Sequence, residues 1–181
     1  QDNGAGNIYS ATASNQWLIF ADSEGIGHQI AEQLQSQDNG CLVVVPGEAY
    51  QVIEANQIQL NPKQPDDFQR LFKELADRDV EAWRGVVYLW GLYASATSMT
   101  VGELESVSYW SAHTPLHLLR ALDGVNGFQK TPLWWVTQGA QRLETEPLAI
   151  AQSLLWGLGR VLSVEQPQQW GGLIDLDPQL A

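Results

Sequence analysis

The feature that most constrains the fold is a repeated alternation of short, strongly apolar runs with longer segments of helical periodicity. Five apolar runs have the character of strands: 16–20, 41–45, 85–90, 133–137 and 172–176. Two more runs, 50–53 and 57–60, alternate in the manner of half-buried strands. Helical spacing of apolar residues extends from Ile26 to Leu34, begins again at Pro65, and returns over 102–123 and 148–165. Continuous apolar strands separated by helices indicate a parallel sheet that is covered on both faces. Right-handed crossovers then predict a doubly wound, Rossmann-like α/β fold.

Two prolines predict where helices begin. Pro65 suits a first helical position, because the N–H that proline lacks would have no partner there. Pro115 falls inside the helical stretch 102–123, so we expect an interruption at that point. Thr114 would then be the N-cap of a second segment, and Pro115 would be its first residue.

The charge balance limits the partners. Nine Lys and Arg residues face 21 Asp and Glu residues, for a net charge of −12. Nucleic acids and anionic membranes favour a basic face, so we expect neither as a partner. No run reaches about 18 apolar residues, and the N-terminal stretch lacks the basic head and apolar core of a signal peptide. The single cysteine, Cys41, lies in an apolar run and is expected to be an inert buried thiol, which favours a cytoplasmic protein.

The length of 181 residues suffices for one domain with a substantial core. We assign that domain to residues 16–178. Asn, Gly, Ser and Ala dominate residues 1–15, which indicates a flexible linker or a trimmed edge. Residues 179–181 are expected to start the linker to a next domain.

The stretch FADSEGIG follows the first strand, where a nucleotide-binding fold has its glycine-rich phosphate loop. Gly25 and Gly27 suit a close contact between helix and sheet, but the early glycine that lets phosphate approach is missing. Asp22 and Glu24 place carboxylates about where phosphate oxygens would lie, and like charges repel. We therefore predict a degenerate loop whose helix is capped by Asp22 or Ser23, with a divergent cofactor loop as the alternative.

The C-terminal stretch SLLWGLGRVLSVEQPQQWGGLIDLDP (153–178) is the most specific part of the sequence. It resembles the structural subdomain of the ketoreductase in modular type I polyketide synthases. Supporting stretches are WRGVVYLWGL (83–92), LHLLRAL (116–122) and LWWVTQGAQ (133–141). The resemblance implies a truncated short-chain dehydrogenase fold that lies N-terminal to a catalytic subdomain.

The resemblance also implies a scaffold. In the family, the catalytic subdomain carries NADPH and the active site, and it reduces β-ketoacyl intermediates bound to the acyl carrier protein. The structural subdomain packs on that catalytic subdomain and stabilises it. For this chain the resemblance therefore implies no catalytic residue, no cofactor and no metal. The implied partner is the catalytic ketoreductase subdomain of the same polypeptide, and other synthase domains and the acyl carrier protein would be indirect partners.

A short-chain reductase needs a Tyr with a Lys four residues later, because the lysine lowers the pKa of the phenol that donates a proton. The residues four positions after the five tyrosines are Ala13, Glu54, Leu92, Thr97 and His113. Alignment of LWGLGR with the family places the pair near Ile150 and Leu154, which are both apolar. Thr137, near the usual catalytic serine, is interpreted as a turn-capping residue. Trp90 could fill cofactor space, pack in the core or contact a partner.

Two histidines, His113 and His117, have helical metal-ligand spacing. No glutamate lies between them, and Pro115 as a first helical residue would place His113 outside the helix. The sequence therefore predicts no metal site there.

Four residues of the family-specific stretch are candidates for the interface with the catalytic subdomain: Trp156, Gly157, Gly159 and Trp170. The two glycines weaken a helix by roughly 1 kcal/mol each relative to alanine, which indicates close packing by the sheet or by the second subdomain. Adjacent Trp134 and Trp135 face opposite sides of a strand, so both sheet faces need cover. Two other functions stay open: a divergent NADPH-binding reductase or epimerase, and a dimerising or interaction module of the synthase.

Overall fold

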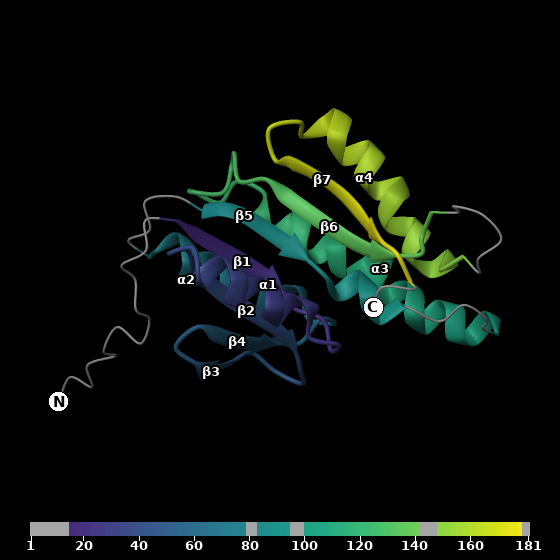
Figure 1. The fold of residues 1–181 in the computed structure, drawn as a ribbon, viewed down its shortest axis with the longest axis horizontal. Helices are drawn as coiled ribbons and strands as arrows, with labels where there is room; N and C mark the ends of the chain where they lie inside the picture. The colour runs from purple at the N-terminus through teal and green to yellow at the C-terminus, as the bar shows by residue number, and fades with distance from the viewer. Residues whose placement is uncertain (1–14, 79–82, 95–99, 142–147, 179–181) are drawn as a thin grey trace.

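The computed structural model describes residues 15–78, 83–94, 100–141 and 148–178. These residues form a seven-stranded sheet with the order β3-β4-β2-β1-β5-β6-β7 (Figure 1). The strands are β1 (Gln16–Phe20), β2 (Gly40–Pro46), β3 (Gln51–Glu54), β4 (Gln57–Leu60), β5 (Trp83–Tyr88), β6 (Leu133–Gln138) and β7 (Trp170–Leu176). All neighbouring strands pair in parallel except β3, which is antiparallel to β4. The expected linkers, 1–15 and 179–181, lie outside the described residues apart from Asn15.

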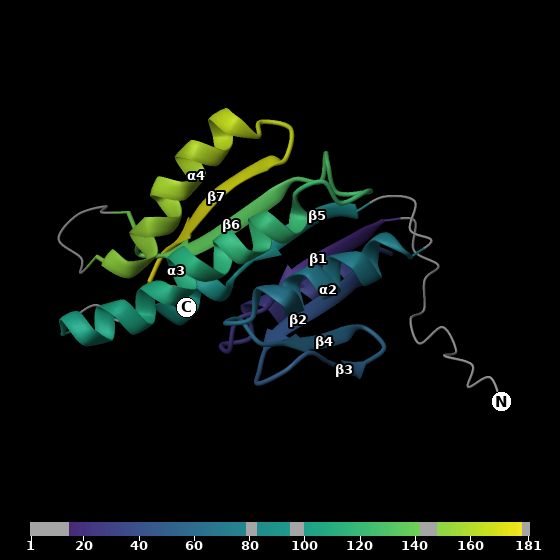
Figure 2. The ribbon, with the colours of Figure 1, turned by 180° about the vertical axis from the view of Figure 1, so that it is seen from behind.

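Helices lie on both faces of this sheet. The α-helices are α1 (Ile26–Gln35), α2 (Pro65–Ala76), α3 (Val101–Leu122) and α4 (Ser153–Glu165), and two short 3-10 helices are η1 (Trp90–Ala94) and η2 (Ile150–Gln152). Figure 1 shows α1 in front of β1 and β2, whereas Figure 2 shows α2, α3 and α4 on the opposite face. The prediction of a Rossmann-like, mainly parallel, doubly wound sheet is confirmed. No helix of the described part is long and apolar enough to cross a membrane.

Two buried clusters hold these layers together. The larger one, under α2, α3 and α4, is rich in aromatic side chains, with Phe20, Phe68 and Tyr88 fully buried. The smaller one, on the α1 side, contains aliphatic residues such as Ile19 and Val43. Burying each such side chain contributes about 1.5–3 kcal/mol to the stability of the fold. The strands alternate these contributions between the two faces, because successive side chains point to opposite sides.

Helix α2 follows directly from its sequence. Pro65 occupies the start of the helix as predicted, and acidic residues in the first turn favour the positive end of the helix dipole. One of them, Asp67, also accepts a hydrogen bond from the backbone N–H of Asn61 at 2.8 Å. The four apolar residues at helical spacing, Phe68, Leu71, Phe72 and Leu75, are all buried against the sheet.

Strand β5 ends two residues earlier than the predicted run 85–90. The N–H of Leu89 still donates to the carbonyl of Phe20, at 2.9 Å, but the chain then turns. The N–H of Leu92 bonds back to Leu89, and Trp90 opens η1. The apolar run therefore continues beyond the strand, because the turn that follows is itself buried.

Helix α3 corrects the expected interruption at Thr114 and Pro115. It is one helix from Val101 to Leu122, with Pro115 inside it, and its N-cap is Thr100 in a capping box with Glu103. A proline in a helix removes a hydrogen bond and pushes away the preceding turn. Two side-chain hydroxyls donate hydrogen bonds to backbone carbonyls near that turn. The hydroxyl of Tyr88 donates to Trp110 O at 2.6 Å, and that of Thr114 donates to Tyr109 O at 3.3 Å.

Smaller differences concern the C-terminal elements. The predicted helix 148–165 divides into η2 and then α4, and β7 starts at Trp170 rather than at residue 172. Trp170 pairs with Leu133 of β6. The strand therefore begins two residues before the predicted run, and the glycines of its sequence obscured this start.

Cys41 is buried between β2 and α1, as the sequence predicted. Its thiol donates to the carbonyl of Ala31, with Sγ 3.7 Å from the oxygen. Burial raises the pKa of the Cys41 thiol to about 11. The thiolate, which is the reactive form, is therefore suppressed at neutral pH.

Candidate functional site

The place to look for a ligand in this fold is the carboxyl edge of the sheet between β1 and β5. From β1 the chain crosses to β2 over one face, and from β5 it crosses to β6 over the other. Ligands of open α/β sheets bind at such a reversal of strand order. The loop after β1, the turn after β5 and the start of α4 meet the edge of the sheet here.

The loop after β1 is closed by Asp22. This buried carboxylate accepts hydrogen bonds from the backbone N–H groups of Glu24 at 2.9 Å, Ile26 at 3.3 Å and Gly27 at 2.7 Å. Two of these donors are the first amides of α1, which a bound phosphate would use in a nucleotide-binding fold. A charged acceptor on several amides is a strong interaction, so Asp22 holds the loop in this shape.

The other residues of the loop have separate roles. Gly25 has φ of 96°, a left-handed conformation that glycine adopts without strain. Gly27 permits the close approach of α1 to the sheet, because a Cβ there would lie 2.7 Å from the Cβ of Ala21. Ser23 and Glu24 are exposed. The capping group is therefore Asp22, and the carboxylate of Glu24 lies at the surface.

Trp90 connects the carboxyl ends of β1 and β5. Its side chain is fully buried, and its indole N–H donates to the carbonyl of Ala21 at 3.0 Å. The ring packs edge-on against Phe20, with centroids 5.1 Å apart, and against Phe68 at 6.0 Å. Of the three roles considered for Trp90, the structure shows core packing, and the same ring bridges the two strands at their reversal point.

The start of α4 fills the next part of this edge. Ile150 and Leu154, near which the sequence placed the Tyr–Lys pair, are both exposed. The buried positions with the same spacing are Ala151 and Leu155. A Cβ on Gly91 would lie 2.5 Å from Cδ1 of Leu155, so the leucine rests directly on the turn after β5. Neither buried position carries a phenol or an amine.

Three tyrosines of the described region have environments unlike that of a catalytic phenol. The pKa values of Tyr88, Tyr93 and Tyr109 are all raised, with burial as the main cause. For Tyr93, a hydrogen bond with Ser23 opposes this shift and the charge of Asp22 adds to it. A proton-donating tyrosine needs the opposite shift.

Thr137 belongs to a polar network that sequence reasoning missed in part. Its hydroxyl donates to Oδ1 of Asp175 at 2.7 Å and accepts from the indole N–H of Trp156 at 3.0 Å. Asp175, in turn, accepts from the backbone N–H groups of Ala140 at 3.0 Å and Gln141 at 2.8 Å. The residue that holds this turn is therefore Asp175, and Thr137 connects it to α4. The aspartate inside the apolar strand WGGLIDL was the available signal.

The four interface candidates separate into two groups. Trp156 contributes its N–H to the Thr137 network, and Trp170 packs edge-on against Trp135 with centroids 5.6 Å apart. Gly159 faces the sheet, because a Cβ there would lie 2.6 Å from Leu173 and 2.8 Å from Trp170. Gly157 has nothing within 4 Å of the position of a Cβ. Gly157 alone thus lies on the outer side of α4.

Gly157 lies in the middle of an exposed apolar row, which we name the α4 stripe. Its members are Ile150, Leu154, Gly157, Val161 and Val164, and the four side chains larger than glycine are 58, 44, 48 and 79% exposed in that order. Their spacing of four, three, four and three residues is the pattern by which one helix packs along another. The stripe has the features of an interaction surface, because large exposed apolar side chains follow one another along η2 and α4.

The two histidines lie in the same helix, contrary to the prediction that His113 falls outside it. His113 stacks on the ring of Tyr109 at 4.9 Å, and Nε2 of His117 lies 3.3 Å from the Tyr109 hydroxyl. Burial lowers the pKa of His117, and the nearby positive charges of His113 and Arg120 add to the effect. Within the described ranges, no three His, Cys, Asp or Glu side chains gather in the manner of a metal site.

Comparisons with known proteins agree with this architecture. The sequence matches the family described as Beta-ketoacyl synthase-like, N-terminal, over residues 15–168. It is 35% identical over 180 residues to pikromycin polyketide synthase component PikAII of Streptomyces venezuelae, an alignment that covers 91% of this chain and 5% of that protein. It is 49% identical over 53 residues to erythronolide synthase EryA3 of Saccharopolyspora erythraea, which covers 29% of this chain and 2% of that protein. The chain thus spans only a small fraction of the length of these relatives.

Solved structures share the fold. An N-terminal ketoreductase from the macrolactin assembly line aligns with a TM-score of 0.67 and 15% identity, over 94% of this chain and 34% of that one. A keto acid-selecting NRPS module with adenylation, ketoreductase and pseudo Asub domains aligns with a TM-score of 0.77 and 20% identity, over 90% of this chain and 13% of that one. The predicted resemblance to a polyketide synthase ketoreductase subdomain is confirmed at the level of family and fold.

Proposed function

We propose, from the premise that this chain belongs to the family described as Beta-ketoacyl synthase-like, N-terminal, that it is the non-catalytic structural subdomain of a polyketide synthase ketoreductase. In this role it packs on the catalytic subdomain of the same polypeptide and stabilises it. The neighbour carries NADPH and reduces β-ketoacyl groups held on an acyl carrier protein. Other synthase domains and the carrier protein meet this chain only indirectly.

The observation that carries the proposal is the filled carboxyl edge between β1 and β5. Asp22 accepts hydrogen bonds from the first N–H groups of α1, Trp90 connects the ends of the two strands, and Leu155 contacts Gly91. These groups do not fit a dinucleotide, because a carboxylate replaces phosphate and two large side chains replace open space. NADPH chemistry is therefore assigned to the neighbour.

The α4 stripe supports the second half of the proposal. It offers an apolar row with a glycine at its centre, where a helix from another body can approach closely. Trp156, Gly159 and Trp170 support this surface from beneath, because they fix α4 to β6 and β7. We assign the stripe to the contact with the catalytic subdomain.

Calorimetric titration of the chain with NADPH tests the missing site. We expect no heat of binding at millimolar NADPH, and a micromolar dissociation constant would instead support a divergent reductase or epimerase. The matched measurement uses the catalytic subdomain produced separately, which should bind NADPH under the same conditions.

Gel filtration of this chain mixed with the separately produced catalytic subdomain tests the stripe. We expect a complex that Leu154→Glu weakens at least tenfold. Ile53→Glu is the matched control, because Ile53 is 44% exposed, like Leu154, but lies on β3 at the far edge of the sheet. Self-association without a complex would instead favour a dimerising module, and equal effects of the two substitutions would remove the stripe from the interface.

A further inference from the structure

On one face of the sheet, the described residues place no helix over β5, β6 and β7. Figure 1 shows these three strands with no helix in front of them, whereas α1 lies in front of β1 and β2. Among the described residues, the long helices that follow β5 and β6 are α3 and α4, and both lie on the opposite face, as Figure 2 shows. Parallel sheets are covered on both faces, because their strands are apolar on both sides. In the part of the chain that the structure describes, no helix covers the β5–β7 half of this face, although Val87 and Val136 on it are buried.

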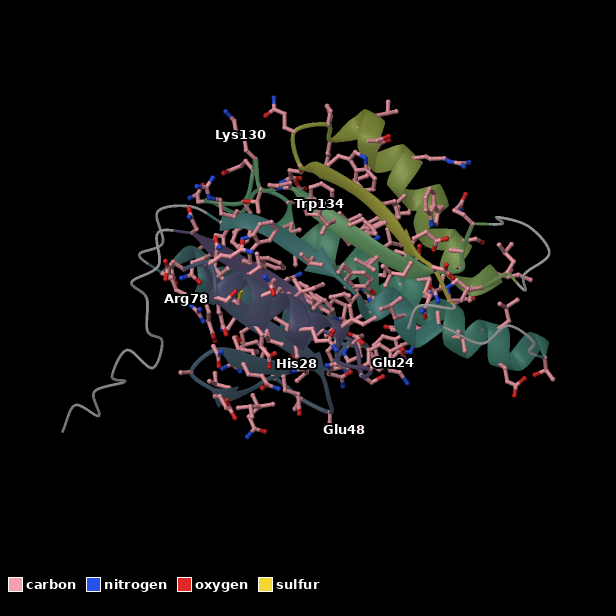
Figure 3. The ribbon with its side chains drawn as sticks, viewed as in Figure 1. Glu24, His28, Glu48, Arg78, Lys130 and Trp134 are labelled. Atoms are coloured by element: carbon pink, nitrogen blue, oxygen red, sulfur yellow. The ribbon has the colours of Figure 1, made fainter. Side chains whose placement is uncertain are left out.

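Apolar side chains occupy this half of the face. We name Trp17, Trp134, Ile174 and Leu176 the sheet platform. Trp17, Trp134 and Leu176 are only partly buried and pack on the cluster of the α1 side. Ile174 is two residues from Leu176 on β7, so it points to the same side, and it is 43% exposed. Figure 3 shows Trp134 on this side, over β6 and β7.

Glycines let the tryptophan rings of the platform lie flat on the sheet. A Cβ on Gly171 would lie 2.7 Å from Cε2 of Trp134, and a Cβ on Gly172 would lie 3.2 Å from Cζ3 of the same ring. The ring of Trp134 therefore lies along β7 instead of projecting into solvent. Trp17 lies in the same manner against Gly85 of β5. The two tryptophans provide a flat apolar area that another element can cover.

We propose that the sheet platform is the docking site of an amphipathic α-helix of the same synthase polypeptide, from outside residues 15–178. The inference rests on the proposed function in one respect, namely that the chain is part of a longer synthase. A helix is the element that covers a parallel sheet, and β6, with six residues of about 3.3 Å each, matches a helix of about 13 residues at 1.5 Å each.

Two observations select this occupant over a second copy of the chain. Two copies would each bring a net charge of −12, and their mutual repulsion opposes association. The known relatives, by contrast, have ample chain to provide a helix. The alignment covers 34% of the macrolactin ketoreductase and 5% of PikAII, so most of each polypeptide lies outside the shared part.

Photo-crosslinking in the intact synthase polypeptide tests the proposal. Benzoylphenylalanine replaces Ile174, and, as a matched control, Ile53, which is 44% exposed on β3. We expect the Ile174 probe to link intramolecularly to one helical segment outside residues 15–178, with at least fivefold the yield of the control. Links to a second copy, links confined to residues 15–178, or a yield equal to that of the control would each overturn it.

Charge substitution gives an independent readout. Ile174→Glu should lower the melting temperature of the intact polypeptide by several degrees more than it lowers that of the 181-residue chain. Ile53→Glu should act alike on both. An equal effect of Ile174→Glu on the two proteins would overturn the docking site. These results are separate from the NADPH titration and the α4 stripe variants, which decide the proposed function alone.

Discussion

The two halves of the sheet are built differently, although one chain forms both. In the half made of β3, β4, β2 and β1, α1 covers one face and α2 covers the other, and the outer strand β3 is short and mostly exposed. In the half made of β5, β6 and β7, the helices that the structure describes lie on one face, and the outer strand β7 has six half-buried residues and the exposed Ile174, most of them apolar or glycine. The first half is complete by itself, whereas the second presents the α4 stripe and the sheet platform to a neighbour.

This contrast separates stability from assembly. A short edge strand such as β3, with Gln51 and Glu54 at its ends, discourages further pairing. Apolar residues left on the surface of the other half lower the stability of the isolated chain and become useful only in contact. We therefore expect substitutions in the first half to act equally in the isolated chain and in the synthase, and those in the second half to act unequally.

The largest expected effect is in the complete half. Phe68→Ala removes a fully buried ring that lies 6.2 Å from Phe20 and 6.0 Å from Trp90, so it should lower the free energy of unfolding by about 3–5 kcal/mol. Urea unfolding followed by tryptophan fluorescence measures the loss. The same loss is expected in the isolated chain and with the catalytic subdomain bound. A loss below 1 kcal/mol would contradict the view that this half is a closed core.

Two glycines of α4 give the next effect, with opposite signs on one helix. Gly159→Ala forces a Cβ against Leu173 and Trp170, so it should destabilise the chain by about 1–3 kcal/mol. Gly157→Ala meets nothing and improves helix propensity, so it should stabilise the isolated chain by about 1 kcal/mol. Thermal unfolding of the two variants measures both signs. Equal signs would show that the two sides of α4 do not differ as described.

Asp22→Ala should have a moderate effect, because three backbone amides lose their acceptor at the junction of the two halves. We expect a loss of about 1–2 kcal/mol in urea unfolding. The control is Glu24→Ala, an exposed acid of the same loop, with an expected change within about 0.5 kcal/mol. If the Asp22 variant gained measurable NADPH affinity, the carboxylate would be the only barrier to the cofactor, and the roles given to Trp90 and Leu155 would be wrong.

The smallest effect concerns pH and the contact between α2 and α3. The pKa of His117 is lower in the fold than its ordinary value of 6.5, so the folded chain binds fewer protons than the unfolded chain. Its contribution to stability is complete above that value and is lost as pH falls through about 6.5 to the lower folded pKa. His117→Gln should remove this part of the acid sensitivity in urea unfolding at pH 7.5 and 5.0. If the free energy of unfolding changed as much between the two pH values in His117→Gln as in the parent chain, the assignment would be wrong.

Much of the fold could be predicted because burial determined it. β1, β2 and β6 lie where continuous apolar runs predicted them, β3 and β4 lie where alternating runs did, and the Phe68 face of α2 followed from helical spacing. The errors come from tertiary contacts that sequence spacing does not contain. Pro115 stays inside α3, where the hydroxyls of Tyr88 and Thr114 bond to the carbonyls of Trp110 and Tyr109 before it. Trp90 leaves the strand because its N–H reaches Ala21.

The candidate site was predictable to a similar depth. The missing early glycine and the acids of the loop indicated a self-capped helix, but only the structure shows that Asp22 caps it and Glu24 does not. The burial of Leu155 and the exposure of Leu154 depend on how η2 leads into α4, and η2 is a short turn with no sequence signal of its own. The division between Gly157 and Gly159 follows from which side of α4 meets β7, which helix spacing alone left open.

The thiol of Cys41 can report how often one region of this molecule opens. Because it lies under α1 and its pKa is about 11, a maleimide added at neutral pH can label it only when α1 lifts from β2. The labelling rate therefore times the opening of that region alone, since the sequence has no second cysteine to add a background signal. Docking of a neighbour onto the β5–β7 half of the sheet would change this labelling rate only if the opening of α1 is coupled to that half.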